Sequence, residues 1–123
     1  MKYLILIYDN PASRKIWEGL PAAQRAEGLA LYTALREDLA ASGELIVSEA
    51  LADPELTTQV AVRDGQTLTT DGPFAEVKEF LAGFFLIECD SLKRAIEHAA
   101  RVPEADFGRV EVRPVMDLTS WEM

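Results

Sequence analysis

Apolar and polar positions along the chain predict a strand followed by a long helix. Residues Lys2–Tyr8 (KYLILIY) form a nearly unbroken run of strand-forming side chains, and the turn sequence DNP follows at residues 9–11. Apolar residues then recur at helical spacing from Pro21, which suits a first helical position, to Gly43. Gly43 suits the end of the helix, because glycine enters the left-handed conformation without steric cost. Gly28 inside the helix should cost about 1 kcal/mol relative to alanine, so we expect a close backbone contact there.

The rest of the chain predicts further strands and a second helix. We expect strands at Leu45–Ala50, Thr58–Arg63, Gln66–Thr70, Gly83–Glu88 and Val110–Val115. Asp64-Gly65 offers a tight hairpin turn between the second and third of these strands. Ser91 can cap a helix that carries apolar residues at i, i+3, i+4 and i+7. In the last strand, Val110 and Val112 should point inward.

This order of elements predicts the fold class. Two β-α-β units joined through an inserted β-hairpin give an α+β protein of ferredoxin-like type, βαββαβ, in which two helices cover one face of an antiparallel sheet. A chain of 123 residues without a linker or an internal repeat is expected to form one domain that spans residues 1–123.

Two strands carry apolar residues on both faces. Leu4–Ile7 and Phe84–Ile87 are apolar throughout, whereas a sheet with helices on one face should alternate. The helices can cover only one face, and the other face would expose a larger apolar patch than monomers usually tolerate. We therefore expect a homodimer packed sheet to sheet. The alternative is that the hairpin, or a C-terminal tail with Leu118 and Trp121, folds over the patch.

The amino-acid composition limits the kinds of partner and cofactor that we expect for this protein. Acidic residues outnumber basic ones by 21 to 12, and the formal net charge of −9 disfavours nucleic acids and anionic membranes as partners. The single cysteine, Cys89, permits no internal disulfide and is expected to be an inert core thiol. Lys2–Tyr8 is too short for a membrane span and lacks a signal-peptide layout, so we expect a cytoplasmic protein. One histidine and one cysteine provide no cluster for zinc or iron; we expect no metal or cofactor, and His98 should face solvent.

The segment Asp71–Glu79 (DGPFAEVKE) combines tight-turn residues with charges. Asp71 can accept hydrogen bonds from backbone amides, the following glycine frees one φ angle, and Pro73 fixes the next. Pro73 also suits the first position of a short helical turn, which would set Glu76 and Glu79 on one side. The segment therefore predicts a rigid corner followed by a charged, half-exposed turn.

DGPFAEVKE closely resembles the signature of the DGPF, or YCII-related, domain family, whose usual form is DGPFAETKE. The resemblance extends from Met1–Tyr8 through Gly83–Ile87 to Val110–Val115, which is nearly the whole chain. It implies a dimeric α/β barrel, in agreement with the argument from the two-faced strands. The chain departs from the family pattern at Val77, where threonine is usual, and at Leu20, where a serine or threonine often caps the helix.

The resemblance gives limited information about function, because members of the family are mostly uncharacterised. Smaller YCII-type relatives have been proposed to use a His–Asp pair as acid and base, with the histidine on the first helix. Tyr32 stands at about that place in this chain, and an unperturbed tyrosine is a poor base at neutral pH. The histidine-based mechanism therefore does not transfer to this sequence.

Four carboxylates are candidates for acid–base chemistry. Asp71 is preferred, although a role as turn-former or helix cap explains this residue equally well. Glu76 and Glu79 act as a pair if burial raises the pKa of one of them; otherwise they are solvated or paired with Lys78. Asp9, at the end of the first strand, either reaches a cleft or belongs to a plain turn.

Five further residues are candidates for substrate binding: Phe74, Tyr32, Arg36, Lys78 and Arg113. Tyr32 and Arg36 lie on the first predicted helix and could face the same cleft as Asp9. Phe74 either walls a ligand pocket or anchors its loop in the core. Arg113, on the sheet face opposite the inward valines, either binds an anionic substrate or pairs with a nearby acidic residue.

Three hypotheses of function follow from these residues. The first is a small cofactor-independent enzyme that acts on a small organic molecule in a cleft near the DGPF loop or the dimer interface, with Asp71 as acid or base. The second is a non-catalytic ligand-binding or regulatory dimer that uses the same cavity. The third is a structural protein whose motif only shapes the dimer.

Overall fold

The computed structural model describes residues 1–119, and its centre is a sheet of four antiparallel strands. These strands are β1 (Lys2–Asp9), β2 (Leu45–Ala50), β5 (Phe80–Glu88) and β6 (Arg109–Pro114), in the spatial order β2-β5-β1-β6. The two apolar runs predicted from the sequence, β1 and β5, are therefore the central neighbours. The mixed α+β class and the antiparallel sheet are confirmed, and the strand order is compatible with the ferredoxin-like arrangement.

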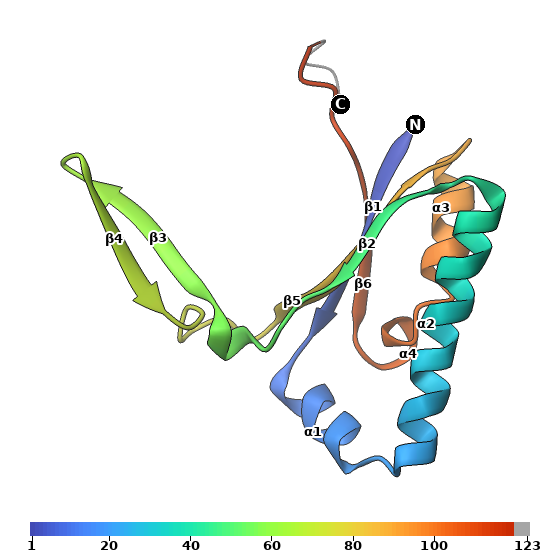
Figure 1. Ribbon diagram of the computed structural model, residues 1–123, viewed down its shortest axis with the longest axis horizontal. Helices are drawn as coiled ribbons and strands as arrows, with labels where there is room; N and C mark the ends of the chain where they lie inside the picture. Colours follow the sequence, from blue (N-terminus) through green and yellow to red (C-terminus); the bar gives the residue numbers. More distant parts are fainter. Residues whose placement is uncertain (120–123) are drawn as a thin grey trace.

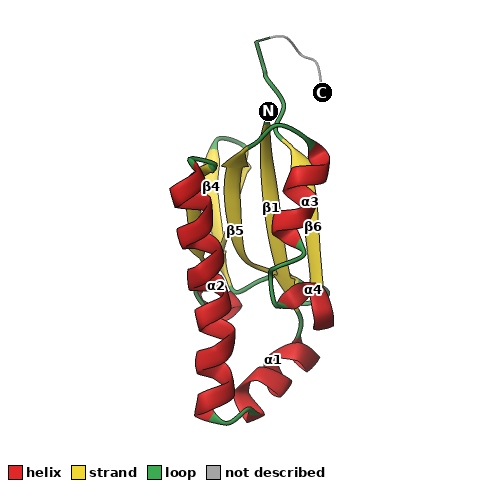
Figure 2. Cartoon of the chain, turned by 90° about the vertical axis from the view of Figure 1, so that its right-hand side faces the viewer, coloured by secondary structure: helices red, strands yellow, loops and turns green. Residues whose placement is uncertain are grey.

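The helices are α1 (Pro11–Gly19), α2 (Ala22–Ser42), α3 (Leu92–Ala99) and α4 (Glu104–Phe107), and a short 3-10 turn, η1 (Pro54–Leu56), follows β2. Helices α2, α3 and α4 lie on one face of the sheet, and α1 lies beyond the end of β1 (Figures 1 and 2). The two predicted helices are α2, which ends at Gly43 with φ of +80°, and α3, which the Ser91 side chain caps. Pro21 is extended and lies one residue before α2, so its expected helical position was wrong.

Helix α1 was not predicted, because its first residues were interpreted as a turn. In the structure Asn10 is the N-cap, and its side chain accepts a hydrogen bond from the Ser13 amide at 2.8 Å. The Ser13 hydroxyl accepts one in return from the Asn10 amide at 3.2 Å, which completes a capping box. Pro11 follows at the first helical position, where a missing N–H removes no helical hydrogen bond.

The two faces of the sheet have different environments. The face toward the helices is buried, and the core that it forms with α2 and α3 includes Tyr3, Ile5, Ile7, Leu35, Leu39, Phe85, Ile87, Ala95 and Ala99. On the opposite face the apolar side chains are only half-buried, and no described helix lies over them (Figure 1); these are Leu4, Leu6, Phe84 and Leu86. Val110 and Val112 pack against the core, as predicted.

The inserted hairpin stands away from the main sheet as an arm (Figure 1). Its strands β3 (Thr58–Arg63) and β4 (Gln66–Asp71) pair with each other around the predicted turn, and every strand residue except Gln59 is exposed. The arm therefore does not cover the apolar face of its own sheet. Leu118 of the C-terminal segment is 62% exposed, and Trp121 lies outside the described residues.

Candidate functional site

A cavity of about 520 Å³ lies between the helices and the end of the main sheet at which β1 finishes. It is lined by the last residues of β1 and β2, the first half of β5, and side chains of α1, α2 and α4. Apolar side chains make up much of its wall, and they include Ile7, Trp17, Leu29, Phe85 and Phe107. A cavity of this size and lining is typical of sites for small organic molecules.

Trp17 fixes one wall of the cavity by packing α1 against α2. Its ring lies over Gly28, where a Cβ atom would approach Cζ3 of the ring to 3.1 Å. A side chain at residue 28 would therefore push the ring aside. The close contact expected at Gly28 is confirmed, and it explains why a glycine stands in the middle of a helix.

Asp9 is the last residue of β1 and lines the cavity. Its Oδ1 accepts hydrogen bonds from the Asn10 amide at 2.9 Å and from the hydroxyl of the buried residue Ser13. Both donors belong to the N-terminal cap of α1. The cap that begins this helix therefore also orients the Asp9 carboxylate.

Glu104 is the first residue of α4, lines the same cavity and is half-buried. Its Oε2 accepts a hydrogen bond from the Tyr32 hydroxyl of α2. Burial and, to a smaller extent, the negative charge of Asp9 raise the pKa of Glu104 from 4.5 to about 7. A carboxyl group with this pKa can both donate and accept a proton near neutral pH.

Of the residues proposed from the sequence, Asp9, Tyr32 and Arg36 line this one cavity together. The structure therefore brings to one place the three residues that were expected to share a cleft. Arg36 is exposed and forms no ion pair within residues 1–119. The functional roles of these residues stay predictions.

The DGPF loop lies outside the cavity, because none of Asp71, Phe74, Glu76, Lys78 and Glu79 lines it. Asp71 ends the exposed strand β4, and Phe74 is 69% exposed rather than anchored in the core. Gly72 has φ of +81°, a conformation that favours glycine. Its N–H donates to the Thr57 carbonyl at 2.6 Å, and its carbonyl accepts from Gln59 Nε2 at 2.8 Å. These contacts tie the base of the arm together.

The prediction of a helical turn after Pro73 was wrong. One reverse turn forms instead, closed by a hydrogen bond from the Val77 amide to the Phe74 carbonyl at 3.0 Å. The physical reason is that residues 74–79 are all exposed, so no packed face stabilises a helix there, and β5 begins at residue 80, three residues earlier than predicted. No helical spacing therefore sets Glu76 and Glu79 on one side, and Glu79 pairs with Arg109 at 2.9 Å.

Two other candidates from the sequence lie away from the cavity. Arg113 is exposed on the uncovered face of the sheet, opposite Leu4 of β1, so its predicted face is confirmed. Lys78 is exposed in the loop before β5. Cys89 is buried and free, as expected of a core thiol.

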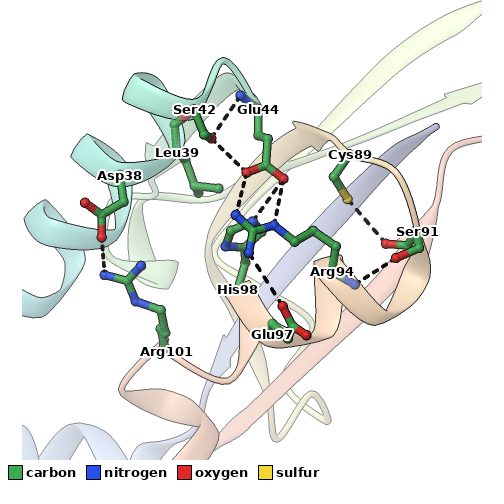
Figure 3. A network of polar contacts seen from close by, with 10 residues as sticks. All are labelled: Asp38, Leu39, Ser42, Glu44, Cys89, Ser91, Arg94, Glu97, His98 and Arg101. Carbon is green, nitrogen blue, oxygen red and sulfur yellow. Dashed lines mark hydrogen bonds and ion pairs between the residues drawn. The ribbon is translucent and has the colours of Figure 1, made fainter.

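His98 was expected to face solvent, and this was wrong, because its side chain is buried. Its Nε2 lies 3.1 Å from Oε2 of Glu44, and Arg94 binds the same carboxylate through two nitrogens at 3.1 and 3.2 Å (Figure 3). Ser42 donates a further hydrogen bond to Glu44 at 2.7 Å. Helical spacing within α3 could not reveal this partner, because Glu44 lies 54 residues earlier in the chain.

Several residues of the cavity were not predicted from the sequence, among them Ser13, Trp17 and Glu104. Ser13 follows Asn10 by three residues, which is the spacing of a capping box, but serine stands where glutamate or glutamine is usual. Glu104 follows Pro103 and is an acidic residue in the first turn of α4, a position that acidic residues favour. This position is therefore only a weak indication of a functional residue. The contact of Glu104 with Tyr32 has no local signal in the sequence.

Within residues 1–119, no group of three or more His, Cys, Asp and Glu side chains is arranged to hold a metal ion. In the same part of the chain, no helix combines the length and the apolar character needed to cross a membrane.

Comparison with known proteins places the chain in a family. The model of the YCII-related domain matches residues 1–119, so the chain belongs to the YCII-related domain family. The chain is also similar to the uncharacterized protein R00369 of Rhizobium meliloti (strain 1021), with 31% identity over 117 residues. That alignment covers 94% of this chain and 92% of the relative. The resemblance first seen in DGPFAEVKE thus extends over the whole domain.

Proposed function

We propose that this member of the YCII-related family is an enzyme that transfers protons on a small organic molecule held in the cavity. The observation that carries the proposal is Glu104, a half-buried carboxyl group with a pKa of about 7 that lies in an apolar cavity beside a second carboxylate. A carboxyl group whose environment raises its pKa toward neutrality is a common general acid or base.

Each polar group of the cavity has a role in this proposal. Glu104 is the acid or base, because its proton can leave and return near neutral pH. The Tyr32 hydroxyl donates to Glu104 Oε2 and so aims the other oxygen at the substrate. Asp9, oriented by Ser13, disfavours the ionisation of Glu104 through its own negative charge. Burial of Glu104 among the apolar walls reduces its contact with water, which strengthens these electrostatic effects.

The proposal places the chemistry in the cavity rather than at the DGPF loop. Asp71, which was preferred from the sequence, stands on an exposed strand end, where solvent would screen its charge. The loop then serves the base of the arm, through the contacts of Gly72 with Thr57 and Gln59.

Proton transfer can be tested before the complete reaction is known. The protein is incubated in deuterium oxide with a panel of small carbonyl compounds and aminoketones, and replacement of C–H by C–D is followed by proton NMR. We expect exchange of at least one compound, and a rate about 10²–10⁴-fold lower for Glu104→Gln. Glu76→Gln, in the exposed loop, is the matched control and should keep the wild-type rate. No exchange with any compound, or an unchanged rate in Glu104→Gln, contradicts the proposal.

The alternative function is a ligand-binding module without catalysis, which the apolar walls of the same cavity support. Such a module would show a ligand-dependent rise in melting temperature but no exchange of protons on the ligand. The exchange experiment therefore separates the two functions.

We also propose that two copies pack through their uncovered sheet faces to form a homodimer, as a dimeric α/β barrel requires. The half-buried apolar residues Leu4, Leu6, Phe84 and Leu86 support this arrangement. The exposed arm supports it too, because an isolated two-stranded hairpin is marginally stable without a packing partner.

Sedimentation analysis tests the dimer. The wild type should sediment at twice the monomer mass at micromolar concentration, and Leu6→Lys on the uncovered face should shift it to the monomer. Leu118→Lys, at a residue that is already 62% exposed, is the control and should leave the dimer intact. A wild-type monomer at this concentration is the opposing result.

A further inference from the structure

Most of the ionisable side chains that line the cavity are acidic. Of the described residues that line it, three are acidic (Asp9, Glu49 and Glu104) and one, Arg36, is basic. Glu49 and Arg36 are exposed, so water and salt screen their charges, whereas Asp9 and Glu104 are half-buried. The two charges that act most strongly on a ligand inside the cavity are therefore both negative.

Both carboxylates accept hydrogen bonds from neutral groups of the protein. Asp9 uses Oδ1 for Asn10 and Ser13, and its Oδ2 has no hydrogen-bond partner within residues 1–119. The Glu104 carboxyl accepts from the Tyr32 hydroxyl and from the backbone amide of Glu104 itself. The negative charge of Asp9 also acts against the ionisation of Glu104, and no cation is among the groups that shift the pKa of Glu104. The charge of Arg14 acts on Asp9, but Arg14 pairs with Asp53 at 2.6 Å. A positively charged donor between the two carboxylates would bind the free oxygen of Asp9 and remove the repulsion.

The remaining walls suit an organic cation. Aromatic residues line the cavity from four elements, and they include Trp17 of α1, Tyr32 of α2, Phe85 of β5 and Phe107 of α4. Aromatic faces attract organic cations as well as apolar groups. The volume of about 520 Å³ leaves room for one ring with a short chain, which is far more than a bare metal ion needs.

From these observations we infer that the ligand of the cavity is an organic cation, a protonated amine with a small apolar or aromatic body. Its ammonium group lies between Asp9 and Glu104, and its apolar part lies against Trp17 and Phe107. The inference rests on the proposed function, since both place the ligand against Glu104. It narrows the substrate class to amines that present a reactive C–H or O–H group to the Glu104 carboxyl.

Three probes of similar shape separate charge from apolar contact: phenethylammonium, 3-phenylpropionate and 2-phenylethanol. Titration calorimetry of the full chain is carried out at about pH 8, where Glu104 is mostly ionised. The cation should bind at least about tenfold more tightly than the alcohol, and the anion more weakly than both. Glu104→Gln and Asp9→Asn should each weaken binding of the cation by about five- to tenfold and leave the alcohol unchanged. Glu76→Gln is the control and should bind all three probes as the wild type does.

Two results would contradict the inference that the ligand is an organic cation. In the first, phenylpropionate binds as tightly as phenethylammonium or more tightly. In the second, neither substitution changes the affinity for phenethylammonium. Circular dichroism of each variant shows whether it is folded, so that a loss of binding is not caused by a loss of structure. The deuterium exchange of the wild type reports on proton transfer independently. Exchange without cation preference refutes only this inference, whereas cation binding without exchange refutes only the enzyme.

Discussion

Two glutamates in the helix layer, Glu44 and Glu104, differ in how the fold treats their charge. Glu44 follows α2 and is held by Arg94, Ser42 and His98 (Figure 3). These contacts, with the Arg94 hydrogen bond as the largest cause, lower the pKa of Glu44 to about 2. Glu44 is therefore a fixed negative charge that joins the end of α2 to α3.

Glu104 has the opposite environment. It accepts hydrogen bonds only from neutral groups, the Tyr32 hydroxyl and its own backbone amide, and the charge that acts on it is the negative charge of Asp9. Burial without a compensating cation raises its pKa to about 7. The comparison teaches that one residue type serves structure where it is paired and becomes available for proton transfer where it is not.

The largest expected difference between the two residues concerns catalysis. Glu104→Gln should lower the proton-exchange rate by about 10²–10⁴-fold, because it removes the group that carries the proton. Glu44→Gln should leave the rate within about twofold at a temperature at which the variant is folded, because Glu44 does not line the cavity. Proton NMR in deuterium oxide measures both rates. A large loss in Glu44→Gln would remove the distinction between the two sites.

The second expected difference is in stability. Glu44→Ala leaves the buried His98 and the guanidinium of Arg94 without their acceptor, and we expect the free energy of unfolding to fall by about 2–3 kcal/mol. Glu97→Ala is the matched control, since Glu97 pairs with the same arginine at 3.5 Å while its side chain is 53% exposed. That change should cost less than about 0.5 kcal/mol. Urea denaturation measures both, and equal losses would argue against a structural role for Glu44.

The third difference is the direction in which each glutamate makes the stability of the folded protein change with pH. The lowered pKa of Glu44 gives stability that is present above about pH 4.5 and is lost as the pH falls toward 2. The raised pKa of Glu104 acts in reverse, because the folded chain holds this proton more tightly than the unfolded chain. Its contribution is present below about pH 4.5 and is lost as the pH rises through 7.

Glu104→Gln should therefore be more stable than the wild type by about 1–2 kcal/mol at pH 8, where the wild type carries a poorly solvated charge. At about pH 5 the two proteins should be nearly equal, since Glu104 is then mostly protonated when folded. Urea denaturation at both pH values provides the measurement. A variant that is less stable than the wild type at pH 8 would show that the charge of Glu104 is compensated.

The smallest expected effect concerns Asp9. Asp9→Asn removes the negative charge that acts on Glu104 and should lower the pKa of Glu104 by a fraction of a unit, because burial is the larger cause of the shift. A carbon-13 NMR titration of the wild type and of the variant measures the change. A return of the Glu104 pKa to about 4.5 in this variant would assign the shift to Asp9 instead of burial.

The sequence predicted those features that depend on neighbouring residues. The continuous apolar strands β1 and β5, the Ser91 cap and the hairpin turn are local patterns, and each is found in the structure. Helix α1 was missed although its signal is local, because a capping box and a turn begin with the same residue types.

The site was predictable only in part, because its contacts join distant segments. Asp9, Tyr32 and Arg36 were expected in one cleft, since strand ends and helix faces often frame clefts. Glu104 reaches Tyr32 across 72 residues, and no spacing in the sequence indicates that contact. The DGPF motif led to the prediction of a site at its own loop. Turn geometry explains Gly72, and no residue of the segment 71–79 lines the cavity.

The protonation of Glu104 tests the central claim most directly. Carbon-13 NMR of the glutamate carboxyl groups, with Glu104→Gln and Glu44→Gln used to assign the two resonances, gives both pKa values in the folded protein. The account predicts a pKa of about 7 for Glu104 and a pKa of about 2 for Glu44. A Glu104 carboxyl that titrates near its ordinary value of 4.5 would contradict the account, because it would be almost fully ionised at neutral pH and would have no proton to donate as the proposed acid.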